Sequence, residues 1–121
     1  MKITRLTKNA LENVIKGDTR QQFKCIIKFY SNQCQYCHNL KSDYQKLAET
    51  FGDNVHFFAF NTSEVSDLDN LIEINGVPTI AFVDVNKRAP RISILQDPKE
   101  PHNDTWYYRA DIERFIEDNI K

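Results

Sequence analysis

The sequence predicts an α/β fold, one domain over residues 1–121 with a central mixed sheet of about five strands and helices on both of its faces. Short apolar segments typical of strands alternate along the chain with segments whose apolar residues recur at helical spacing. This alternation favours a largely parallel sheet. The last two expected strands are too close in sequence for a helical crossover, so we expect them to pair antiparallel. With 121 residues and 40% hydrophobic content, the chain is long enough to bury one core.

The first part of the chain predicts a strand, a helix and a second strand. Residues 2–6 alternate apolar and polar side chains, as a short strand does. Apolar residues between positions 10 and 15 then follow helical spacing, and Gly17 is a suitable helix C-cap. Residues 23–30 are apolar at nearly every position, which is typical of a central strand covered on both faces.

The strongest helical pattern follows Cys37 and ends at Gly52. Its apolar stripe consists of Leu40, Tyr44, Leu47, Ala48 and Phe51. Residues 55–60 then predict a strand that is rich in aromatic side chains.

The C-terminal half predicts two more strands and two helices. A short helix is expected over residues 68–72, followed by a strand over 79–85, a polar turn at 86–88 and a strand over 91–95. The polar segment 96–105 predicts a surface loop. The final helix has an apolar stripe at Ile112, Phe115, Ile116 and Ile120. We expect Trp106 to pack this helix, away from Cys34.

Composition narrows the function classes. The 16 basic and 17 acidic side chains leave a net charge of −1, which argues against a nucleic-acid partner held by bulk electrostatics. No apolar run approaches the roughly 20 residues that span a bilayer, and the first residues do not form a secretion signal, so we expect no membrane association. Three cysteines do not make a structural disulfide framework, and a reducing, cytoplasmic location is the expectation.

The candidate chemistry lies at Cys34-Gln35-Tyr36-Cys37, between the central strand and the strongest helix. Free backbone N–H groups and the positive end of a helix dipole stabilise a thiolate, and such placement lowers a cysteine pKa from about 8.5 into a range of roughly 3.5–7.5. A spacing of three residues brings both sulfurs to one side of the first turn. One sulfur can then attack a disulfide and the other can resolve the mixed disulfide.

Three other interpretations use the same residues. Two cysteines can simply lie near each other in a core. Cys34 to His38 also matches the C-x-x-C-H of covalent haem attachment, but that site belongs to mostly helical exported proteins with a distal axial ligand. A structural zinc ion wants four ligands, and Cys34, Cys37 and His38 supply three at most. We therefore expect no metal and no cofactor besides the Cys34–Cys37 disulfide itself.

Several segments together resemble one known family. They are Phe29-Tyr30, Cys34-Gln35-Tyr36-Cys37, the run from His38 to Glu49, and Gly76-Val77-Pro78-Thr79. The chain is similar to the thioredoxin superfamily over nearly its whole length, and its helix run is most similar to the catalytic domains of protein disulfide isomerases. The resemblance implies a thioredoxin-like fold and a cis bond between Val77 and Pro78 that faces the cysteines. It also implies that substrate lies along this proline and the residues between the cysteines, Gln35 and Tyr36.

Among the positions that depart from the family pattern or match it loosely, two bear on the pKa values of the cysteines. Many relatives have a buried acid at the position of Lys28, where it moves protons to and from the second cysteine. As an ammonium, Lys28 would favour thiolates; desolvated, it would act as a neutral base; or it would extend to the sheet edge and solvent. Arg109 resembles an arginine that approaches the second cysteine in isomerase-type domains, although a solvated arginine fits equally. Both are candidates for modulating the cysteine pKa values.

These observations predict a thiol–disulfide oxidoreductase with Cys34 as nucleophile and Cys37 as resolving thiol. The expected partners are protein disulfide substrates and a thioredoxin-reductase-type reductant, and the expected role is a cytosolic reductase. The alternatives are an isomerase-like or oxidising domain, and a non-enzymatic module that binds a partner in the Pro78 groove. Cys25 lies mid-strand among apolar residues, where a free thiol behaves as a small hydrophobe.

Overall fold

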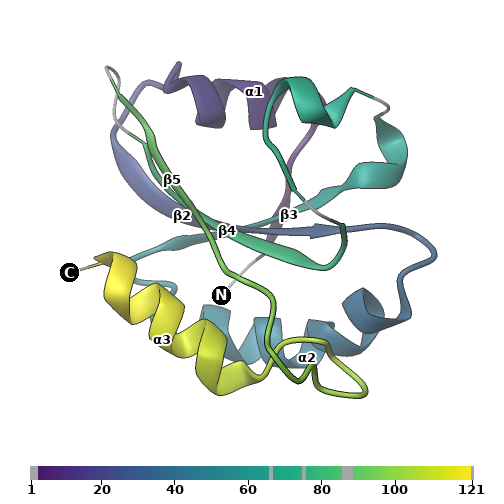
Figure 1. Cartoon of the computed structure of the whole chain (residues 1–121). Helices are drawn as coiled ribbons and strands as arrows, with labels where there is room; N and C mark the ends of the chain where they lie inside the picture. The colour runs from purple at the N-terminus through teal and green to yellow at the C-terminus, as the bar shows by residue number, and fades with distance from the viewer. Residues whose placement is uncertain (1–2, 66, 75, 86–88, 121) are drawn as a thin grey trace.

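A computed structural model describes residues 3–65, 67–74, 76–85 and 89–120 of the chain. In chain order its elements are β1 (Thr4–Arg5), α1 (Lys8–Lys16), β2 (Phe23–Tyr30), α2 (Gln35–Phe51), β3 (His56–Asn61), the 3₁₀ helices η1 (Thr62–Glu64) and η2 (Leu68–Asn70), β4 (Thr79–Val85), β5 (Arg91–Ile94) and α3 (Arg109–Ile120). Helix α1 covers one face of the sheet, and α2 and α3 cover the other (Figure 1). The predicted layered fold is confirmed.

The five strands form one mixed sheet in the order β1-β3-β2-β4-β5. β3 runs parallel to both β1 and β2, whereas β4 is antiparallel to both β2 and β5. The antiparallel pairing of the last two strands is confirmed, but the expected largely parallel sheet is wrong. A parallel return would need a full crossover element, and the connection from β3 to β4 contains helices of only three residues each.

Other boundaries also differ from the sequence prediction. Within the described residues the first strand contains Thr4 and Arg5, while Lys2 of the expected strand lies outside them. The helix expected over 68–72 is a single 3₁₀ turn. Leu68 and Ile72 are buried in the core under α1, so their spacing reflects packing of a short turn rather than a longer helix. The polar turn expected at 86–88 lies outside the described residues. Gly17 ends α1 with a φ of 75°, a left-handed conformation that suits glycine.

Strand β2 divides the core into two parts because its side chains alternate between the faces of the sheet. Cys25, Ile27 and Phe29 pack in the cluster under α1. Ile26 packs in the cluster under α2 and α3, and Lys28 follows it on the same face. β2 therefore directs a lysine toward the helix that begins at the candidate site.

No helix in the described part of the chain is long and apolar enough to cross a membrane.

Candidate redox site

Cys34 and Cys37 are joined by a disulfide at the start of α2, with their Cα atoms 5.2 Å apart. Cys34 is the N-cap of the helix, and its Sγ accepts a hydrogen bond from the backbone N–H of Cys37 at 3.0 Å. The first turn contains no acidic side chain that would oppose negative charge on sulfur. The helix dipole and the N–H donor therefore favour a thiolate at Cys34 once the disulfide is reduced.

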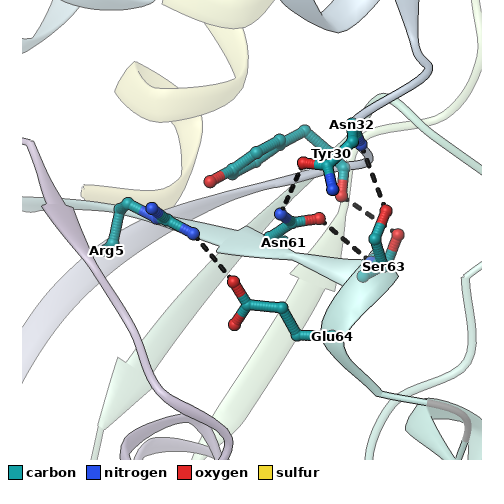
Figure 2. A network of polar contacts seen from close by, with 7 residues as sticks. Arg5, Tyr30, Asn32, Asn61, Ser63 and Glu64 are labelled. Carbon is teal, nitrogen blue, oxygen red and sulfur yellow. Dashed lines mark hydrogen bonds and ion pairs between the residues drawn. The ribbon is translucent and has the colours of Figure 1, made fainter.

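The segment between β2 and α2 is held by hydrogen bonds to the last residue of β3 and to η1, which follows it (Figure 2). Asn61 donates from Nδ2 to Oδ1 of Asn32 at 2.8 Å, and the backbone N–H of Asn32 donates to Oγ of Ser63 at 3.1 Å. The hydroxyl of Thr62 donates to the carbonyl of Tyr30 at 3.0 Å. These bonds fix the chain that leads to Cys34. Single polar contacts of this kind leave no periodic pattern in a sequence, so these bonds were not predicted.

The three cysteines differ in exposure. Cys34 is half-buried, Cys37 is 2% exposed, and Cys25 is fully buried and free. Burial raises the pKa of the Cys25 thiol to about 12. Cys25 is thus unreactive at neutral pH, and Cys34 is the sulfur that an incoming disulfide can approach.

The bond between Val77 and Pro78 is cis, as the resemblance implied. In the antiparallel register Phe29 of β2 lies opposite Thr79 of β4. The end of β2 that leads to Cys34 and the start of β4 therefore lie at the same end of the sheet. This places Val77 and Pro78 at the end of the sheet where the disulfide lies.

Lys28 is buried in the central strand of the sheet, with 5% of its surface exposed. The interpretation in which it extends to the sheet edge and solvent is therefore wrong. Its Nζ lies 5.0 Å from the ring centroid of Tyr44 and 5.7 Å from that of Tyr30. Burial, and secondarily the charge of Lys41, lower the Lys28 pKa from 10.5 to about 8. Lys28 and Cys37 line the same cavity, which has a volume of about 440 Å³.

Arg109 lies in a different place from the dithiol. Its guanidinium is 3.9 Å from Asp43 and 4.0 Å from Glu113, and it lines a separate cavity between α2 and α3. No contact of Arg109 with either cysteine is found among the described residues. The structure thus favours the solvated arginine of the sequence analysis over a group that modulates the pKa of Cys37.

The loop between β5 and α3 passes beside the start of α2 (Figure 1). Asn39 donates from Nδ2 to the carbonyl of Asp104 at 2.8 Å, and the indole of Trp106 donates to Asp97 at 3.1 Å. Trp106 also packs edge-on against Tyr36, with ring centroids 5.5 Å apart. Trp106 packs against the core cluster that includes the last helix, as predicted, but it also reaches Tyr36, a residue between the two cysteines, and this approach was not predicted.

We expect the fluorescence of Trp106 to change reversibly when the Cys34–Cys37 disulfide is reduced. Trp106 is the sole tryptophan of the chain, and its contact Tyr36 belongs to the segment that the disulfide closes. The measurement is an emission spectrum of the oxidised and the reduced protein. In the Tyr36→Leu variant the change should shrink. Identical spectra of the oxidised and reduced wild type would contradict the contact.

The described residues contain no group of three or more His, Cys, Asp or Glu side chains that could hold a metal ion.

The family model described as Thioredoxin matches residues 2–101. The thioredoxin of Borreliella burgdorferi is 30% identical over 87 residues, which cover 72% of this chain and 70% of that protein. A candidate protein disulfide-isomerase of Schizosaccharomyces pombe is 26% identical over 84 residues, which cover 69% of this chain but only 16% of that longer protein.

Solved structures share the fold at low sequence identity. The Trx4 domain of ERdj5 has a TM-score of 0.76 at 13% identity, covering 98% of this chain and 96% of that one. Mitochondrial thioredoxin 3 from Saccharomyces cerevisiae has a TM-score of 0.67 at 22% identity, covering 96% and 94%. The match to the family model, together with a C-x-x-C disulfide at the start of α2, shows that the chain belongs to the thioredoxin family of thiol–disulfide oxidoreductases.

Proposed function

We propose that this protein reduces disulfides of other proteins and is itself recharged by a thioredoxin-reductase-type partner in the cytoplasm. The observation that carries the proposal is the position of the Cys34–Cys37 disulfide at a helix N-terminus, with one sulfur half-buried and the other buried. The similarity to a bacterial thioredoxin over most of both chains supports the direction of electron flow. The cytoplasmic location is supported by the few cysteines of the chain.

The reaction transfers two electrons from the dithiol to the substrate. The Cys34 thiolate attacks one sulfur of the substrate disulfide, and the other substrate sulfur leaves as a thiolate that takes up a proton. The Cys37 thiol then loses its proton and attacks Cys34 Sγ, which forms the Cys34–Cys37 disulfide and releases the second substrate sulfur. Two electrons and two protons from the reductant restore the dithiol.

Substrate binding is assigned to residues around the half-buried sulfur. Gln35 and Tyr36 are exposed on the first turn of α2. Val77 and Pro78 come directly before β4, at the same end of the sheet. An extended peptide that pairs with the backbone near Pro78 would therefore present its disulfide to Cys34.

Lys28 is assigned to the proton chemistry of Cys37, because both line one cavity. Below its pKa of about 8, the ammonium favours the Cys37 thiolate by charge attraction. Above that pH, the neutral amine is able to accept the Cys37 proton. A lysine can therefore assist the loss of the Cys37 proton, either through its charge or as a base, in place of a buried carboxylate.

The decisive measurement is the reduction potential of the Cys34–Cys37 pair, by equilibration with glutathione buffers. If the protein is a reductase, we expect a reduction potential near the roughly −270 mV of thioredoxin. A potential near −180 mV would indicate an isomerase or an oxidant. An assay of protein-disulfide reduction with a dithiol as electron donor accompanies it. A protein that forms the disulfide but shows no turnover would be a binding module, which contradicts the proposal.

A further inference from the structure

We propose that the cavity beside the dithiol is a binding site for a small organic oxyanion, a molecule that bears a carboxylate or phosphate group. The cavity of about 440 Å³ is within the range of roughly 300–1,000 Å³ typical of small-molecule sites. It lies over the face of the sheet that α2 covers, and the peptide groove of the proposed function lies instead at Pro78.

The floor of this cavity is a row of residues across three strands. Arg5 of β1 pairs with Ala59 of β3, and Ala59 pairs with Lys28 of β2. All three line the cavity. The small side chain of Ala59 leaves room between two cationic neighbours, and this is why the row forms a hollow.

The lining of the cavity is rich in basic side chains. Lys41 and His38 of α2 line it together with Arg5 and Lys28. No aspartate or glutamate lines the cavity among the described residues. Arg5 is paired with Glu64 at 2.9 Å (Figure 2), and Glu64 is not among the residues that line the cavity. Lys28 and Lys41 are therefore the charges available to a ligand.

The second, independent observation is the state of Lys28. Lys28 has only 5% of its surface exposed, and it lines the cavity. The described residues give its Nζ no hydrogen bond and no ion pair, only the ring faces of Tyr30 and Tyr44. A buried ammonium is ordinarily paired, because removing an ion from water is costly. An oxyanion in the cavity would supply the missing partner.

The remaining lining residues determine the body of the ligand. Ile3 and Tyr30 present apolar surface, Ser31 and Asn32 present polar groups, and both cysteines of the disulfide also line the cavity. A bare inorganic ion would leave most of the apolar wall without contact. The lining therefore fits a compact organic molecule whose anionic group lies between Lys28 and Lys41.

The test is a titration of the oxidised protein with inorganic phosphate and, separately, with succinate, at constant ionic strength set by chloride. Amide NMR shifts should saturate and concentrate at residues that line the cavity. Saturation by succinate alone would assign carboxylates as the ligand class, and saturation by phosphate alone would assign phosphates. Shifts that rise linearly with both probes, or that spread over the whole surface, would overturn the proposal.

Two lysines of one strand face give a matched pair of variants. Lys28→Met should weaken binding by about tenfold or more, the loss expected for one charge-assisted hydrogen bond. Lys24→Met should bind as the wild type does, because Lys24 lies toward the other end of β2 and donates to the carbonyl of Ile120. Equal affinity of Lys28→Met and wild type would overturn the proposal.

If Lys28→Met does not fold, two variants on the exposed surface of α2 decide. Lys41→Met should weaken binding severalfold, while Lys46→Met, outside the cavity, should not. Equal affinities in these two variants would overturn the site. The affinity of the wild type should also fall as the pH rises through the Lys28 pKa of about 8, because the ligand binds the charged form. Since every readout is binding, failure here would leave the reductase assignment untouched.

Discussion

Replacing Cys34 with serine should reduce protein-disulfide turnover to the uncatalysed rate. The hydroxyl does not replace the thiolate that attacks the substrate, and the other two sulfurs are buried. Replacing Cys37 with serine should stop turnover as well but at a later step. Attack by Cys34 remains possible without the resolving thiol, so a mixed disulfide should accumulate.

Intact-mass analysis separates the two variants. Cys37→Ser should gain the mass of a small disulfide substrate, and Cys34→Ser should not. Cys25→Ser is the matched control and should keep wild-type turnover, because the Cys25 thiol is buried with its pKa raised to about 12. Residual turnover in Cys34→Ser would place the nucleophile elsewhere.

Replacing Lys28 with methionine should raise the free energy of unfolding at pH 7 by about 2 kcal/mol. The fall of the Lys28 pKa from 10.5 to about 8 corresponds to about 3 kcal/mol of unfavourable burial of the charge. Contacts of the ammonium with the rings of Tyr30 and Tyr44 offset about 1 kcal/mol. Methionine has a similar shape and carries no charge, so the burial cost is relieved.

The pH dependence has a definite sign. Between pH 8 and 10.5 the unfolded chain holds a proton on Lys28 that the folded protein has lost, so wild-type stability rises with pH across this window. The advantage of Lys28→Met should therefore shrink as the pH increases above about 8. Urea unfolding at a series of pH values measures both effects.

A second lysine on the same strand face is the control for this substitution. Lys24→Met loses a hydrogen bond to Ile120 and should be no more stable than wild type. A Lys28→Met protein that is less stable than wild type at pH 7 would mean that the aromatic contacts outweigh the cost of burial.

Much of the fold was predictable because its signals are local. The apolar run of β2, the stripe of α2 and the glycine that ends α1 all depend on neighbours within one element. The pair Cys34 and Cys37 was found in the same way, from their place between a strand and a helix. Strand order and direction depend on contacts between distant segments, and this is why the antiparallel pairing of β2 with β4 was missed.

The chemistry around the dithiol was predictable only in part. The sequence did not decide whether the Lys28 side chain is buried near the cysteines or solvated. Its burial depends on strands β3 and β4, which flank β2. The approach of Trp106 to Tyr36 depends on a loop whose path is fixed by single polar bonds, such as that from Asn39 to Asp104. Ala59 gave no signal at all, since a small residue in a strand has significance only beside its larger neighbours.

The buried thiol of Cys25 has a practical consequence. At neutral pH a thiol reagent reaches it only when the strand that holds it opens, because the folded state leaves it neither exposed nor ionised. With Cys34 and Cys37 kept as a disulfide, Cys25 is the thiol left to react, and its slow modification measures the fraction of molecules in which the strand is open. The rate at which a thiol reagent adds its mass to Cys25 therefore reports how often the folded protein opens, in dilute solution and without denaturant.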